Sequence, residues 1–318
     1  RVVREEVAVV AYDPGWPESF RREEEHLRSC LPPELIGRIE HFGSTAVPGL
    51  AAKPIVDMLV EVHDLSAARE RIAPLLTGRG YEYFWRPTYG DDGPPWYAWF
   101  IKRDGRTGAR THHIHMVPAD FEEHWDRLLV CDYLRDHPAA AAEYAALKAR
   151  LVADGGGDRR AYADGKRAFL DRLTELARGE RDLARRFDAF FAGHVGSREA
   201  FEAVRAAIGR QGRTEIRVGK SQIGFRDGAP FAWAWVPGRY LRGPRPPLVL
   251  TVALAARDPS PRWKQVVEAA PGRFVHHLEL GGAGDVDGEV EGWLRRARQL
   301  ASSRPTGRRA GRSGGAGG

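Results

Sequence analysis

Cysteine is scarce in this chain of 318 residues, and long apolar runs are missing. Two cysteines, Cys30 and Cys131, are too few for a cysteine-based metal site, and their number argues against a disulfide framework. No stretch of about 18 consecutive apolar residues occurs, so the sequence predicts no membrane-spanning helix. The first ten residues lack the pattern of a secretory signal, and free thiols fit a reducing compartment. We therefore expect a cytoplasmic protein with no membrane partner.

Lysine is also rare, with six lysines among 49 basic residues. The net charge of +6 and a pI near 9.5 are typical of proteins that bind nucleic acid. However, the segment Ser302–Gly318 carries four arginines and no acid, which leaves +2 for the rest of the chain. We expect this Gly/Arg tail, residues 302–318, to be disordered and to make only nonspecific contacts with nucleic acid.

The composition, 42% hydrophobic and 29% charged, is that of a globular protein, and the length allows two domains. Helices are expected from Pro17 and over Leu65–Arg79, and the pattern is helical from Phe121 to Leu176 with a break at Gly155–Gly157. Short β-branched runs predict strands at Val7–Tyr12, Ile36–Phe42, Ile55–Val62, Tyr81–Arg86, Trp96–Lys102 and Thr111–Val117. Strands followed by a helical block favour an α+β or a mixed α/β domain over residues 1–178.

A second, smaller α+β domain with a mainly antiparallel sheet is expected over residues 183–300, after a boundary near Gly179–Arg181. Its expected helices are Leu183–Ala192, Glu199–Ile208, Arg262–Ala269 and Val286–Leu300. Its expected strands are Glu215–Val218, Gln222–Arg226, Phe231–Val236, Leu248–Leu254 and Arg273–Leu280. Trp233 and Trp235 share a strand face, so we expect them to pack in a core, the alternative being an aromatic pocket.

The stretch from Glu40 to Asp57 carries the most specific chemistry of the sequence. A strand ends at Gly43, and Ser44 and Thr45 follow at a turn that opens the segment Gly43–Lys53, which is expected to be a loop or a short helix. Such a turn presents free backbone N–H groups that favour a phosphate. The next strand carries Asp57, which could hold a divalent metal against that phosphate. The alternative is a glycine turn with a capping Ser44 and a structural Asp57.

This stretch resembles the signature of the GrpB-like family, a resemblance that extends over about residues 5–175. The other matching segments are Tyr12–Pro14 with Trp16–Pro17, His113–His115, Tyr133–Arg135 with His137–Pro138, and Tyr162 with Lys166 and Phe169. The resemblance implies an α+β, nucleotidyltransferase-like fold with a mixed sheet and helices, and it implies an activity much more weakly. Residues 183–300 resemble a small bacterial domain of unknown function, on the segments Lys220–Phe225, His276–His277 and Asp287–Trp293.

One position departs from active nucleotidyltransferases, which carry two acids one residue apart on the strand after the Gly-Ser turn. Here Leu59 stands at the second position, and Glu61 lies about 13 Å further along, at about 3.3 Å per residue. His113 and His115 share one strand face and could join Asp57 around a divalent metal (Mg, Mn or Zn), or one could act as a base. The alternative is that both histidines make structural hydrogen bonds.

Basic and aromatic side chains elsewhere could complete a phosphate site. The predicted contributors beside Gly43, Ser44 and Thr45 are Lys53, Arg135, Tyr162 and Lys166. Tyr162 and Lys166 are four residues apart and therefore share a helix face. The loop Thr88–Trp96, with Asp91 and Asp92, is a candidate lid.

These patterns predict a protein that binds a nucleotide or another phosphate-bearing small molecule, and they leave open whether it is a metal-dependent nucleotidyl or phosphoryl transferase. The catalytic candidates are Asp57, His113 and His115, with Asp57 and His115 as metal ligands. A non-catalytic ligand sensor is the alternative, and a nucleic-acid-binding protein is less favoured because of the charge distribution. Leu59 separates the first two functions, since a transferase needs bound metal and turnover, whereas a sensor needs only binding.

Overall fold

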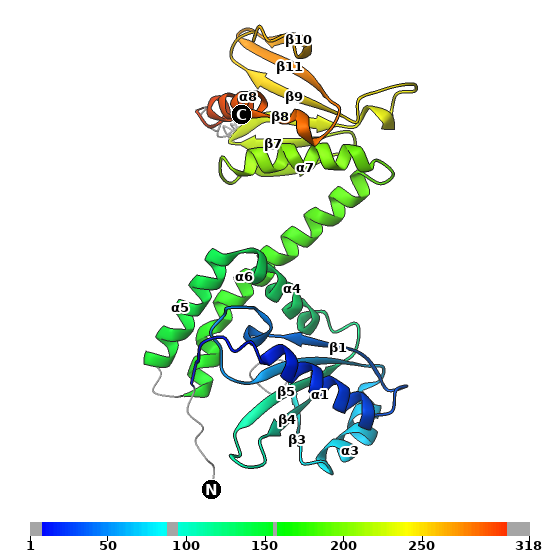
Figure 1. Cartoon of the computed structure of the whole chain (residues 1–318), viewed down its shortest axis with the longest axis vertical. Helices are drawn as coiled ribbons and strands as arrows, with labels where there is room; N and C mark the ends of the chain where they lie inside the picture. The colour runs from blue at the N-terminus through cyan, green and yellow to red at the C-terminus, as the bar shows by residue number, and fades with distance from the viewer. Residues whose placement is uncertain (1–7, 88–94, 155–157, 304–318) are drawn as a thin grey trace, which may run out of the picture. The chain divides into compact units, whose positions relative to one another are not determined.

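The computed structural model describes residues 8–87, 95–154 and 158–303, which fold into two compact units (Figure 1). The units divide between Arg181 and Asp182. Each combines helices with one β-sheet, which confirms the α+β class expected from the sequence.

The N-terminal unit is built on a five-stranded mixed sheet in the order β1-β2-β5-β4-β3. β2 and β5 are parallel, and the other neighbours are antiparallel. The strands are β1 (Ile36–Phe42), β2 (Val56–Val62), β3 (Glu82–Pro87), β4 (Trp96–Arg103) and β5 (Arg110–Val117). Central β2 is apolar apart from Asp57 and Glu61, because both of its faces are covered.

Two groups of helices cover the two faces of this sheet. The first group packs with Met58, Phe100 and Ile114 in one core, and it comprises α1 (Trp16–Cys30), α2 (Leu65–Ala67), the π-helical turn η2 (Ala68–Ile72) and α3 (Ala73–Thr77). The second group packs with Leu59 and Val117 in another core, and it comprises α4 (Glu122–Asp136), α5 (Pro138–Asp154) and α6 (Arg159–Phe190). Asp57, two residues before Leu59, therefore faces the second group.

The C-terminal unit has an antiparallel sheet in the order β10-β11-β9-β8-β7-β6. Its strands are β6 (Glu215–Val218), β7 (Ile223–Asp227), β8 (Ala229–Trp235), β9 (Leu248–Leu254), β10 (Trp263–Ala270) and β11 (Arg273–Leu280). Its helices are α7 (Val195–Gly209) and α8 (Gly288–Ser302), with the short turns η3 (Pro237–Arg239) and η4 (Ala283–Asp285). One sheet face packs with α7, α8 and the end of α6 in a single core.

Three sequence-based expectations were wrong. The segment Arg262–Ala269 is not a helix: from Trp263 onward it belongs to strand β10, because pairing with β11 outweighs its helical pattern. The helical pattern expected to end at Leu176 and the helix expected over Leu183–Ala192 belong to one helix, since α6 continues to Phe190 and one glycine, Gly179, costs a helix only about 1 kcal/mol. Trp233 and Trp235 lie outside the core, which is formed instead by Phe225 and Phe231.

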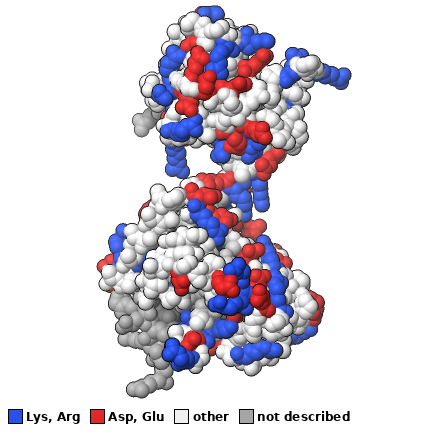
Figure 2. Space-filling view, viewed as in Figure 1, with Lys and Arg blue, Asp and Glu red and all other residues white. Residues whose placement is uncertain are grey.

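Several expected features lie wholly or partly outside the described residues. They are the loop with Asp91 and Asp92, the break at Gly155–Gly157, the tail beyond Ser303 and the start of the strand expected at Val7–Tyr12. Within that expected strand, Val10 forms an isolated bridge with Ala52. The described helices include none long and apolar enough to cross a membrane. Basic and acidic side chains are interspersed over the face shown in Figure 2.

Candidate functional site

The loop after β1 brings the main chain against the side chain of Asp57. Phe42, the last residue of β1, is the register partner of Asp57 on β2, so Gly43 lies beside the carboxylate. Gly43 has φ = +76°, and a Cβ there would lie 2.7 Å from Asp57 Oδ2. Both the backbone conformation and the close approach require glycine at this position.

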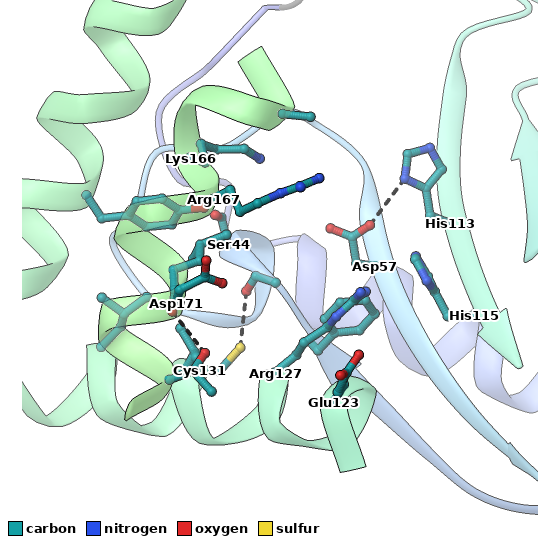
Figure 3. A pocket seen from close by; sticks show the side chains of 18 of the residues that line it. Ser44, Asp57, His113, His115, Glu123, Arg127, Cys131, Lys166, Arg167 and Asp171 are labelled. Atoms are coloured by element: carbon teal, nitrogen blue, oxygen red, sulfur yellow. Dashed lines mark hydrogen bonds and ion pairs between the residues drawn. The ribbon is translucent and has the colours of Figure 1, made fainter. Parts of the chain in front are cut away.

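Asp57 and His113 meet across the parallel pairing of β2 and β5. The two residues are register partners, and Asp57 Oδ1 lies 3.2 Å from His113 Nδ1 (Figure 3). His113 Nε2 is buried and has no hydrogen-bond partner among the described residues. The contact fixes the imidazole ring, and it fits a tautomer in which Nδ1 donates to the carboxylate and Nε2 is left as an acceptor.

His115 shares the strand face of His113 but lies among aromatic rings. Its ring is 5.3 Å from that of Tyr97 and 5.2 Å from that of Phe42, and burial holds its pKa well below the usual range. Its register partner is Leu59, which is fully buried. His115 is therefore a neutral, enclosed imidazole at neutral pH.

The described residues do not form an all-protein metal site of the kind expected. Over 8–87, 95–154 and 158–303, no group of three or more His, Cys, Asp or Glu side chains is placed to hold a metal ion. Asp57 and His113 are in contact, but the apolar side chain of Leu59 occupies the position of a second acid. Asp57 and His113 thus supply two candidate ligands, fewer than a closed all-protein site uses.

Ser44 is held from behind by a buried lysine. Lys148, on α5, is 1% exposed, and its Nζ donates to Ser44 Oγ at 3.1 Å and to the carbonyl oxygen of Ala51. Burial lowers the pKa of Lys148 to about 7, and the nearby charge of Lys166 acts in the same direction. Lys148 thereby connects both ends of the loop from Ser44 to Ala51.

Six of the predicted site residues line a single cavity of about 930 Å³, between the sheet and helices α4 and α6 (Figure 3). They are Gly43, Ser44, Asp57, His113, His115 and Lys166. Ser44 begins a three-residue 3₁₀ turn, η1 (Ser44–Ala46), where the sequence left a loop or a short helix open. A turn this short has no appreciable macrodipole, so positive charge in the cavity has to come from side chains.

Four other predicted residues do not line this cavity. Thr45 is buried, with Oγ1 3.0 Å from His41 Nε2, and Arg135 donates to the carbonyl oxygen of Ala46. The ring of buried Tyr162 lies 4.1 Å from Lys53 Nζ and 4.5 Å from Lys166 Nζ. Tyr162 and Lys53 thus support Lys166 from outside the cavity.

Two arginines that the sequence-based reasoning missed face the same cavity. Arg86 ends β3 and lies 4.7 Å from the ring centre of Trp99, and Arg127 lies on α4 one turn after Glu123. Among the residues that the structure describes, neither arginine forms an ion pair, and the same holds for Lys166. The Glu123–Arg127 spacing on an otherwise apolar helix face, with Val130 and Leu134, was the available signal.

The comparison with known families covers both units. Residues 6–176, more than half of the chain, match the model of the GrpB protein family. The chain belongs to the GrpB family. Residues 187–301 match a domain of unknown function, DUF5655. These matches confirm the resemblances inferred from the sequence, and they assign the cavity to the GrpB domain.

The GrpB domain also has relatives among individual proteins. The UPF0157 protein YqkA of Bacillus subtilis is 35% identical over 175 residues, which are 55% of this chain and 48% of that protein. The chain thus spans about half of that relative. A UPF0157 protein of Pseudomonas aeruginosa is 36% identical over 192 residues, covering 56% of this chain and 76% of that protein. The crystal structure of GrpB from Enterococcus faecalis is 31% identical, covers 55% of this chain and 99% of that chain, and has a TM-score of 0.47.

Proposed function

We propose that the cavity of the GrpB domain binds a phosphate-bearing small molecule of the nucleotide class. The observation that carries the proposal is the convergence of Arg86, Arg127 and Lys166 on one cavity, without an ion-pair partner for any of them in the described ranges. The three cations are partly buried, and the carboxylates of Asp57 and Glu123 line the same cavity without forming an ion pair with them. Partly buried cations without an ion-pair partner favour an anionic ligand. Arginine in particular presents a planar donor fork that matches a phosphate group.

The shape and lining of the cavity support a nucleotide rather than a bare phosphate ion. A volume of about 930 Å³ is in the range of small-molecule sites, which is about 300–1,000 Å³. Trp99 is half-buried and lines the cavity with the cations, and its ring offers a stacking surface for a base. Tyr97 also lines the cavity, but it is buried and its ring stacks on His115. The implied nucleotidyltransferase-like fold, with a Gly-Ser loop before the strand of Asp57, agrees with this ligand class.

A second candidate function is group transfer, favoured by the contact between Asp57 and His113. A carboxylate that orients an imidazole through Nδ1 leaves Nε2 as an acceptor for a proton from an attacking hydroxyl or water. We derive no step through a metal ion, because the described residues do not form a site for one. In a non-catalytic sensor, the same cavity would bind its ligand without turnover.

Isothermal titration calorimetry of the full chain tests the proposed binding. The ligands are ATP, GTP, CTP, UTP and dephospho-coenzyme A, each with and without magnesium or manganese. Arg127→Ala should weaken binding of the ligand at least tenfold. A tenfold loss of affinity corresponds to about 1.4 kcal/mol, and one charge-assisted hydrogen bond contributes about 1.5–3 kcal/mol. Arg22→Ala is the control, since Arg22 is 67% exposed on α1. The absence of binding, or equal binding by Arg127→Ala, would contradict the proposal.

Turnover separates transfer from sensing. If the protein is a transferase, His113→Gln should lower kcat by about 100-fold or more, in the range of a lost general base, with a smaller change in ligand affinity. If bound ligand is recovered unchanged after prolonged incubation with acceptor candidates, the sensor function holds.

A further inference from the structure

The DUF5655 domain has a cavity of its own, of about 560 Å³, on one face of its sheet. It lies on the opposite face from the core, because alternation along β8 turns Ala232 and Ala234 toward the core and Trp233 and Trp235 away from it. Both tryptophans remain half-buried. The residues lining the cavity include Gln222, Trp233, Trp235, Tyr240, Thr251 and His277.

The aromatic walls of this cavity are held in place by main-chain features. Gly224 on β7 is the register partner of Trp233, and a Cβ at Gly224 would lie 3.3 Å from Trp233 Cδ1. The missing side chain leaves the indole room to lie close over the strand. Tyr240 is 53% exposed, but its hydroxyl donates to the carbonyl oxygen of Lys220 at 3.0 Å. These contacts fix two aromatic rings before any ligand binds.

The polar floor of the cavity is a cross-strand pair. Thr251 on β9 and His277 on β11 are register partners, and Thr251 Oγ1 lies 2.9 Å from His277 Nδ1. Burial lowers the pKa of His277, so the imidazole is neutral at pH 7. His277 Nε2 has no hydrogen-bond partner within the described ranges, and Gln222 adds an exposed amide at the rim. A ligand can therefore find both donors and acceptors here.

Charge distinguishes this cavity from the one in the GrpB domain. No Lys, Arg, Asp or Glu is among the described residues that line it, so it offers no compensation for a charged group. Aromatic walls with a few polar groups suit a flat, uncharged ring with hydrogen-bonding edges. We propose that this cavity binds a neutral planar heteroaromatic ring, of the nucleobase or nucleoside class.

The position of the sequence motifs agrees with a built site. Gln222 and Gly224 belong to the segment Lys220–Phe225, and His277 belongs to the pair His276–His277. These segments lie about 50 residues apart in the sequence and meet at this cavity together with Trp233. The core lies on the other face of the sheet, so a side chain smaller than Trp233 would leave it intact. Fold stability alone therefore does not require a half-exposed tryptophan packed over Gly224.

Calorimetry of the full chain with adenosine, guanosine, cytidine and uridine tests this site, because nucleosides carry no phosphate for the GrpB cavity. At least one nucleoside should bind, and Trp233→Ala should weaken that binding tenfold or more, as expected when a stacking ring is lost. Thr251→Val, which keeps the shape but removes the hydrogen bond to His277, should also weaken it. Val267→Ala is the matched control, because Val267 is 41% exposed on β10.

Three results would overturn the proposal. One is that no nucleoside binds at millimolar concentration. Another is that Trp233→Ala and Gln222→Ala both bind nucleoside as the parent does. Gln222→Ala is included because Gln222 is exposed and its loss cannot disturb the core. The third is that Arg127→Ala abolishes nucleoside binding while Trp233→Ala preserves it, which would assign the nucleoside to the GrpB cavity. Loss of ATP binding alone leaves this proposal intact, so the two sites are tested separately.

Discussion

The buried amine of Lys148 makes the stability of the GrpB domain depend on pH in a direction that can be measured. Burial lowers its pKa from 10.5 to about 7, with the charge of Lys166 as a smaller cause. Between pH 7 and pH 10.5 the unfolded chain therefore binds a proton that the folded chain lacks. The free energy of unfolding should rise with pH in this window, and below pH 7 this rise is absent because both states are protonated.

The size of the effect follows from the pKa difference. One pH unit corresponds to about 1.4 kcal/mol per proton, so the rise between pH 7.0 and 8.5 is about 1.5 kcal/mol, because the folded state is half protonated at pH 7.0. Lys148→Met removes this rise and adds a pH-independent cost of about 1–3 kcal/mol for each acceptor left unpaired, Ser44 Oγ and the carbonyl of Ala51. Burial raises the pKa of Cys131 to about 11, so this thiol lowers stability only as the pH rises above about 9, where the unfolded thiol ionises, and it does so equally in the parent and in Lys148→Met.

Guanidinium unfolding of the full chain at pH 7.0, 7.5, 8.0 and 8.5, followed by far-ultraviolet circular dichroism, measures the difference between the parent and Lys148→Met. This difference should grow by about 1.5 kcal/mol across the series. The control is Arg22→Met, which removes an exposed cation from the same unit and should give a constant difference. A constant difference for Lys148→Met would show that Lys148 stays protonated in the fold, and the reasoning from burial would fail.

Three further substitutions test the packing around the candidate site. Gly43→Ala should destabilise the chain by about 2–3 kcal/mol in thermal unfolding, more than Gly80→Ala does. Both glycines have positive φ, but only at Gly43 would the new Cβ meet a carboxylate, that of Asp57. Equal losses for the two variants would refute the contact with Asp57. Asp126→Asn should lower the free energy of unfolding by about 3 kcal/mol in denaturant, because the buried carboxylate pairs with Arg178 and Arg181. Asp132 is exposed, so Asp132→Asn should change stability by less than about 0.5 kcal/mol. Similar values for both variants would show that the burial of Asp126 is unimportant. Leu59→Asp should destabilise by more than about 3 kcal/mol, because Leu59 is fully buried, and manganese calorimetry should detect no gain in affinity; a stable, metal-binding variant would revive the two-acid site.

The sequence by itself determined those features that depend on local periodicity and on backbone conformation. Apolar runs such as Ile55–Val62 predicted strands, and alternation correctly placed Asp57 and Leu59 on one face. The glycine in the Gly43–Ser44 turn was identified because few residues tolerate such a conformation. His113 and His115 were recognised as same-face neighbours for the same reason of period two. These inferences hold because they involve residues a few positions apart.

Tertiary structure decided which of these residues meet a ligand-sized cavity. Arg86 lies on strand β3 and Arg127 on helix α4, 41 positions apart in the sequence. Only the packing of α4 on the sheet brings the two arginines to one cavity. The contact between Thr45 and His41 depends on the single 3₁₀ turn after β1, in a segment for which the sequence left a loop or a short helix open. Trp233 lies outside the core because α7 and α8 cover the other face of its sheet. Alternation along a strand defines two faces, but the choice between them is made by the helices that pack there, and this choice depends on contacts between residues far apart in the chain.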